Sequence, residues 1–141
     1  MLCYVLLRVL ELLHPFMPFI TEEIWQALPH EGDYLIRAQW PTYRQEFDFA
    51  AEERAMEAVK DAISAVRARR AEMNVPPSRK AKIIITSQTP EIYVGGRDFI
   101  TRLAYASEVE VGSQAPQDLN GMVTVSTHDA TMYLPLAELV D

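Results

Sequence analysis

The pattern of apolar and polar positions changes once along the chain, near residue 77. Before that point, apolar residues recur at spacings of three and four, which is typical of helices that bury one face. After it, β-branched residues alternate with polar ones or form short runs, which is typical of strands. The sequence therefore predicts an α+β fold, with a helical part over residues 1–77 and a small α+β part over residues 78–136.

The helical part begins with a strongly apolar run and a corner that contains prolines. Residues 2–13 are apolar on more than one face, so we expect this helix to be deeply packed. Pro15 and Pro18 interrupt the helical pattern, and Thr21 is placed to cap a second helix, which Pro29 ends. The first run starts without a capping residue, so we expect it to continue a longer helix that begins before residue 1.

The longest predicted helix starts at about residue 50. Its apolar residues recur at spacings of three, four or seven and form one stripe. They are Met56, Val59, Ile63, Val66 and Met73. We expect the helix to end near Asn74, because Val75 precedes two prolines and is disfavoured in the helical region.

The α+β part contains about four predicted strands and two short helical segments. The strand patterns occupy residues 82–86, 108–111, 122–126 and 131–134, and a turn is expected at 127–130. The helical patterns occupy residues 90–94 and 98–106. Gly95 and Gly96 are expected to separate these two segments rather than to form a phosphate loop.

The composition excludes several classes of function. A chain of 141 residues with 49% hydrophobic and 23% charged residues is typical of a folded globular protein. Cys3 is the single cysteine and the three histidines are isolated, so we expect no internal disulfide, no metal site and no cofactor in this chain. No signature of a phosphate loop or an activated nucleophile is present. Because no apolar run approaches the ~20 residues of a membrane span, we expect a soluble, cytoplasmic protein.

The sign of the charge reverses locally within an acidic chain. The whole chain carries a net charge of −7, yet residues 60–82 contain seven basic and two acidic side chains. Two interpretations stay open: a solvated basic face, or a site for a large anion such as a nucleic-acid backbone. Arg67, Arg70 and Asn74 are spaced i, i+3, i+7 and therefore share a helix face.

Two motifs resemble a known enzyme family. LHPFMPFITEEIWQALP, from Leu13 to Pro29, resembles a segment of the anticodon-binding bundle of class I aminoacyl-tRNA synthetases for aliphatic amino acids. RARRAEMNVPPSRK, from Arg67 to Lys80, looks like the last helix and exit of that bundle in valyl-tRNA synthetases. YLPL, at 133–136, also resembles that family at the point where it enters a C-terminal coiled-coil arm.

The resemblance implies a non-catalytic piece of a large ligase that joins valine to its tRNA. The catalytic domain, which uses ATP, and the editing domain would precede residue 1, and residues 137–141 would start a truncated C-terminal arm. The implied partner is valine tRNA, and no association with a membrane is expected. The full-length enzyme is expected to be a monomer, whereas the piece alone is expected to self-associate through apolar surface that missing helices would cover.

The resemblance also implies which residues meet the tRNA. Arg67 and Arg70 would face the anticodon arm, with Asn74 available for a base edge or a backbone cap. Arg69 and Arg79 would be secondary phosphate contacts. An alternative for Arg70 is an ion pair with a carboxylate inside the bundle.

Other interpretations concern the aromatic residues and the role of the chain. Trp25, Trp40 and Tyr43 are candidates for base stacking, but in a domain of this size we expect them to lie in the core. The alternative to tRNA binding is a structural brace or a protein–protein docking module.

Overall fold

The computed structural model describes residues 1–116 and 118–139, and its contacts divide the chain into two compact units. The first unit is Met1–Asp48 and the second is Phe49–Asp141. The predicted boundary at residue 77 differs from this division, because the long helix that precedes it buries its apolar stripe on the sheet that follows it.

The first unit is helical and has a small core. It contains helices α1 (Leu2–Leu13) and α2 (Pro18–Gln26) and the 3₁₀ helices η1 (Leu35–Arg37) and η2 (Gln45–Phe47). Its fully buried apolar residues are Leu10, Trp25 and Leu35. The expectation that α1 is deeply packed is wrong for this structure, because the described chain covers only one of its faces. Its exposed apolar residues are Leu2, Val5, Leu6, Val9 and Leu12.

The start of α2 also differs from the prediction. Pro18 occupies the first turn and Met17 is the N-cap residue, without a side-chain cap. Pro at this position has its φ already fixed near the helical value and lacks only an N–H that would have no partner there. Thr21 therefore lies inside the helix, where its Oγ1 donates a 2.8 Å hydrogen bond to the Met17 carbonyl and lies 2.8 Å from Nδ1 of His14.

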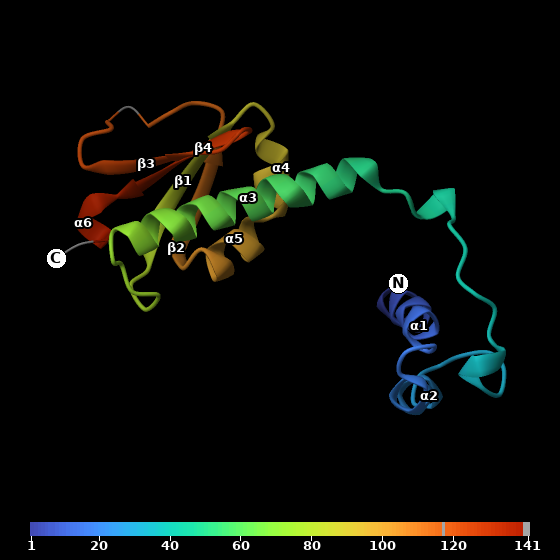
Figure 1. Cartoon of the computed structure of the whole chain (residues 1–141). Helices are drawn as coiled ribbons and strands as arrows, with labels where there is room; N and C mark the ends of the chain where they lie inside the picture. Colours follow the sequence, from blue (N-terminus) through green and yellow to red (C-terminus); the bar gives the residue numbers. More distant parts are fainter. Residues whose placement is uncertain (117, 140–141) are drawn as a thin grey trace. The chain divides into compact units, whose positions relative to one another are not determined.

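The second unit combines one long helix with a four-stranded mixed sheet (Figure 1). The sheet has the strand order β2 (Ala106–Gly112), β1 (Ala81–Ser87), β4 (Ala130–Pro135), β3 (Met122–Ser126). Strand β1 is parallel to β2 and antiparallel to β4. The four predicted strands and the α+β class are confirmed. The elements are α3 (Ala50–Glu72), β1 (Ala81–Ser87), α4 (Pro90–Gly95), α5 (Arg97–Leu103), β2 (Ala106–Gly112), β3 (Met122–Ser126), β4 (Ala130–Pro135) and α6 (Leu136–Leu139).

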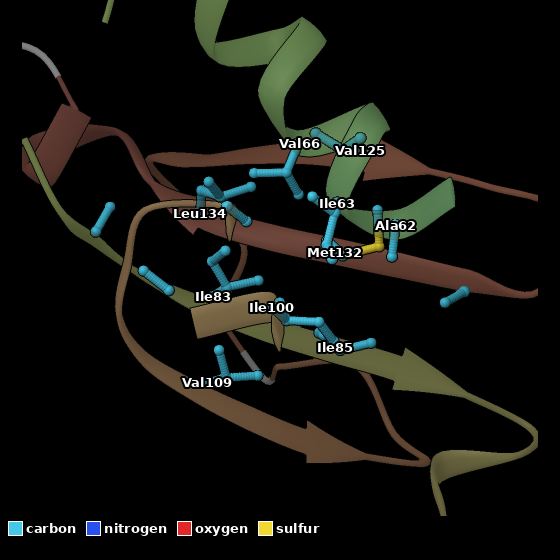
Figure 2. Packing of buried hydrophobic residues seen from close by; sticks show 14 of the residues in the cluster. Ala62, Ile63, Val66, Ile83, Ile85, Ile100, Val109, Val125, Met132 and Leu134 are labelled. Carbon is cyan, nitrogen blue, oxygen red and sulfur yellow. The ribbon is translucent and has the colours of Figure 1, made fainter. Parts of the chain in front are cut away.

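Helix α3 packs on one face of this sheet. The predicted stripe is buried at Val59, Ile63 and Val66, whereas Met56, nearer the start of the helix, is exposed. Figure 2 shows Ile63 and Val66 above the strand that carries Met132 and also Leu134. Along β1, buried and half-buried residues alternate, so that one side of the strand faces the helices.

The end of the second unit adds one more contact to β1. Glu138 of α6 accepts a 2.7 Å hydrogen bond from the backbone N–H of Lys82. The expected start of a C-terminal arm at 137–141 falls partly on residues 140 and 141, which lie outside the described residues.

Candidate nucleic-acid interface

The arginines at the end of α3 point in two directions. Arg69 is exposed, and its Nη1 lies 2.9 Å from Oε2 of Glu72, three residues later on the same helix. Arg67 and Arg70 lie together on another side, with their guanidinium carbons 5.8 Å and 5.7 Å from the centre of the Tyr105 ring. Arg67 and Arg70 therefore do share a helix face, as their spacing predicts, and on that face both cations lie over one aromatic ring.

Arg70 is buried, with 3% of its surface exposed. Its Nη2 donates to the carbonyl oxygens of Pro76, at 3.2 Å, and of Arg79. Among the residues that the structure describes, the partners of Arg70 are therefore backbone carbonyls and an aromatic ring, not the carboxylate of the alternative interpretation. Burial lowers the pKa of the Arg70 guanidinium, and the neighbouring Tyr105 opposes that effect.

Asn74 ends the helix in a left-handed conformation, with a φ of 56°. The N–H of Val75 donates to the Arg70 carbonyl at 2.9 Å, and the N–H of Asn74 donates to the Ala71 carbonyl at 3.0 Å. These two bonds form the Schellman arrangement, which satisfies the last carbonyls of a helix. Of the two roles expected for Asn74, the geometry supports the backbone cap. The Asn74 side chain is exposed, and its contact with a base stays a prediction.

The loop after α3 is held tightly rather than extended. The N–H of Arg79 donates to the Pro76 carbonyl at 3.1 Å, and the same carbonyl accepts from Arg70. Arg79 is half-buried and Lys80 is exposed. The buried arginine thus fixes the path of the segment that carries the next two basic residues.

Lys82 belongs to the sheet rather than to the arginine group. Its Nζ bonds to the carboxylate of Glu110 and lies 3.6 Å from that of Glu108. The hydrogen bond to Glu110 raises the pKa of Lys82. This cation is already neutralised, so the basic surface is smaller than the sequence indicates.

The three aromatic candidates for base stacking lie in the first unit and behave differently. Trp25 is 3% exposed and stacks on His30 with ring centres 3.5 Å apart, so it is a core residue as expected. Trp40 and Tyr43 are exposed by 60% and 79%, which corrects the expectation that they lie in the core. Tyr105 was not predicted as a site residue, because its contact with α3 joins segments distant in the sequence.

The described residues contain neither a candidate membrane span nor a candidate metal site. No helix within residues 1–116 or 118–139 is long and apolar enough to span a bilayer. Nor does this described part of the chain gather three His, Cys, Asp or Glu side chains that would hold a metal ion.

Comparison with known proteins relates the chain to tRNA ligases. Residues 1–85 match a family described as the anticodon-binding domain of tRNA ligase. The chain is 40% identical over 143 residues to a valine–tRNA ligase of Halalkalibacterium halodurans, covering 99% of the chain and 16% of that protein. It is 40% identical over 134 residues to that of Clostridium perfringens, covering 94% of the chain and 15% of the relative. With that of Geobacillus kaustophilus it shares 41% identity over 145 residues, or 99% of the chain and 16% of the relative.

The chain thus spans about 16% of the length of the curated relatives it matches most fully. The family match covers the first unit and all of α3, including its arginines, and ends within β1.

Proposed function

Because the chain belongs to the family of anticodon-binding domains of tRNA ligases, we propose that it binds the anticodon arm of valine tRNA through the cationic end of α3. The observation that carries this proposal is the placement of Arg67, exposed at the end of a matched helix, beside a second arginine and an aromatic ring. Phosphate contacts from cations fix a protein on RNA, while exposed bases of a loop are bound by stacking and edge contacts.

The specificity for valine rests on the relatives, which are named valine–tRNA ligases. The whole protein of which this chain is a part would join valine to tRNA, using ATP bound by a catalytic domain outside these residues. In that protein, which we expect to be a cytoplasmic monomer, the chain would bind and position tRNA without taking part in the chemical step.

The proposed contacts differ in how directly the geometry supports them. Arg67 is exposed and, among the described residues, has no carboxylate partner, so it is the leading candidate for a phosphate. Arg69 would exchange its exposed ion pair with Glu72 for a phosphate, a small loss because such pairs contribute little. Arg70 and Asn74 would act mainly by holding the end of the helix and the segment to Arg79.

The first test is binding of the purified chain to valine tRNA and to an unrelated tRNA across a salt series. We expect preference for valine tRNA and an affinity that falls as salt rises, because bound phosphates release counterions. Arg67→Ala is expected to reduce the slope of log affinity against log salt by about 1.

The matched control is Arg54→Ala. Arg54 is exposed on the same helix, 13 residues before Arg67, a separation of roughly 20 Å along the axis. Loss of the same charge there is expected to leave the slope almost unchanged. Equal slopes for both variants would contradict the placement of the site, and absence of tRNA binding by the intact chain would favour a structural brace.

A further inference from the structure

Two like charges share the ring of Tyr105 without a counterion in the described chain. The guanidinium carbons of Arg67 and Arg70 both lie within 6 Å of the ring centre, at 5.8 Å and 5.7 Å. Within residues 1–116 and 118–139, neither arginine has a carboxylate at ion-pair distance. Since like charges repel, this arrangement is favoured when an anion lies beside it.

The buried member of the pair also has an unused donor. Nη1 of Arg70 is inaccessible to solvent and has no hydrogen-bond partner within the described part of the chain, although Nη2 donates to two carbonyls. A buried cation without a counterion is costly for a protein. Because no carboxylate of the described residues offsets it, the charge of Arg70 adds a positive potential behind Arg67. Arg67 is the exposed arginine of the pair.

Tyr105 adopts a backbone conformation that its side chain disfavours. Its φ is 57°, in the left-handed region that glycine and asparagine occupy more readily than a bulky residue. Strained residues of this kind are found preferentially at binding and catalytic sites. The residue joins α5 to β2, and its ring lies under both guanidinium groups. The connection alone would be made more easily by glycine, so the ring has a separate use.

We propose that Arg67, Arg70 and Tyr105 form a phosphate-binding site in which Tyr105 is a positioning residue that holds the Arg67 guanidinium ready for a phosphodiester. Arg67 donates to the phosphate oxygens, and Arg70 contributes its charge from beneath without touching the ligand. That the phosphodiester belongs to tRNA rests on the proposed function, whereas the phosphate chemistry does not.

Two variants separate the ring from the backbone. Tyr105→Gly removes the ring and suits the left-handed conformation, whereas Tyr105→Phe keeps the ring. The probe is inorganic pyrophosphate, titrated into the full chain while the Nε–H resonance of Arg67 is followed by NMR. Circular dichroism checks the fold of each variant, and Tyr105→Asn replaces the glycine variant if that variant does not fold.

We expect pyrophosphate to shift the Arg67 resonance in the intact chain and in Tyr105→Phe. In Tyr105→Gly, the affinity is expected to fall about two- to fivefold, the usual effect of losing an exposed cation–π contact. A purely structural role for Tyr105 would lower the melting temperature without changing the affinity of the folded protein. That result, or an unshifted Arg67 resonance in the intact chain, overturns the proposal.

The tRNA salt series separates this proposal from the proposed function. If pyrophosphate binds at Arg67 but no tRNA binds, the phosphate site stands and the anticodon role fails. If valine tRNA binds the intact chain and Tyr105→Gly with the same affinity at every salt concentration, the anticodon role stands and the site at Tyr105 is refuted.

Discussion

Asn74 is the residue at which the helix that carries the arginines stops. Its left-handed φ of 56° allows Val75 to turn back and bond to the Arg70 carbonyl, while the side chain of Val75 enters the core of the second unit. Asparagine tolerates this conformation because its short polar side chain clashes less than a branched one.

Substitutions at Asn74 are expected to follow the demands of the backbone. Asn74→Val is expected to destabilise the second unit by about 1–2 kcal/mol, the usual cost of a left-handed conformation in a residue with a Cβ branch. Asn74→Gly is expected to keep or slightly raise the free energy of unfolding. Denaturation with urea, followed by circular dichroism, measures both.

The glycine variant also tests the second role expected for Asn74. It keeps the cap but removes the amide side chain, so its affinity for valine tRNA should equal that of the intact chain if Asn74 acts only as a cap. A clear loss of affinity in a variant of unchanged stability would show that the amide meets the RNA.

The sequence predicts the basic cluster at the end of α3 but not the environment of each arginine. Spacing alone placed Arg67 and Arg70 on one face, as the structure shows. It did not distinguish the exposed residue from the buried one, because the burial of Arg70 depends on a loop and on Tyr105, which is 35 positions later in the chain. Helical periodicity carries no information about such distant contacts.

At the scale of the secondary-structure elements, the junction of α4 and α5 lies close against α3. A Cβ added to Gly96 would lie 2.6 Å from a methyl carbon of Val59, and Gly96 is buried. The two glycines that the sequence assigned to a break between helical segments thus do different things, because a Cβ on Gly95 would meet no atom within 4 Å.

Gly96→Ala is therefore expected to destabilise the second unit by about 1–3 kcal/mol, the usual effect of overpacking a core. Val59 is branched at Cβ and has little freedom to move aside. Gly95→Ala is the matched control, and it is expected to be neutral or mildly stabilising because alanine favours the helix. Thermal melts of both variants test this, and equal destabilisation would show that the close approach is not limiting.

Strands were predicted more successfully than helix ends. The runs at 82–86 and 122–126 are rich in β-branched residues bounded by turns, and both became strands. The start of α2 was missed because a threonine followed by two glutamates resembles a capped first turn, whereas Pro18 had already begun the helix. Local propensity therefore predicts that an element exists more reliably than it predicts the residues at which the element begins and ends.

At the scale of the whole molecule, the two units have cores of very different size. Three fully buried apolar residues form the core of the first unit among the described residues, against twenty in the second. Buried apolar area is the main source of stability, so we expect the first unit to be much the less stable.

This difference is measurable because both tryptophans, Trp25 and Trp40, lie in the first unit. Tryptophan fluorescence is expected to report unfolding of that unit at lower denaturant than circular dichroism, to which the second unit contributes α3 and the sheet. Non-coincident transitions by the two probes would show separate unfolding. Coincident transitions would contradict it.

The position of β1 in the sheet has a consequence for the order of events on the ribosome. The family match ends at residue 85, inside β1, yet β1 lies between β2 and β4, which are made later. During translation, the apolar stripe of α3 is made before Met132 and Leu134, on which it packs. The arginine pair is likewise made before Tyr105, which it contacts. The border drawn by sequence similarity is thus not the border of a folding unit, and the proposed phosphate-binding site is complete only after Tyr105 has been made.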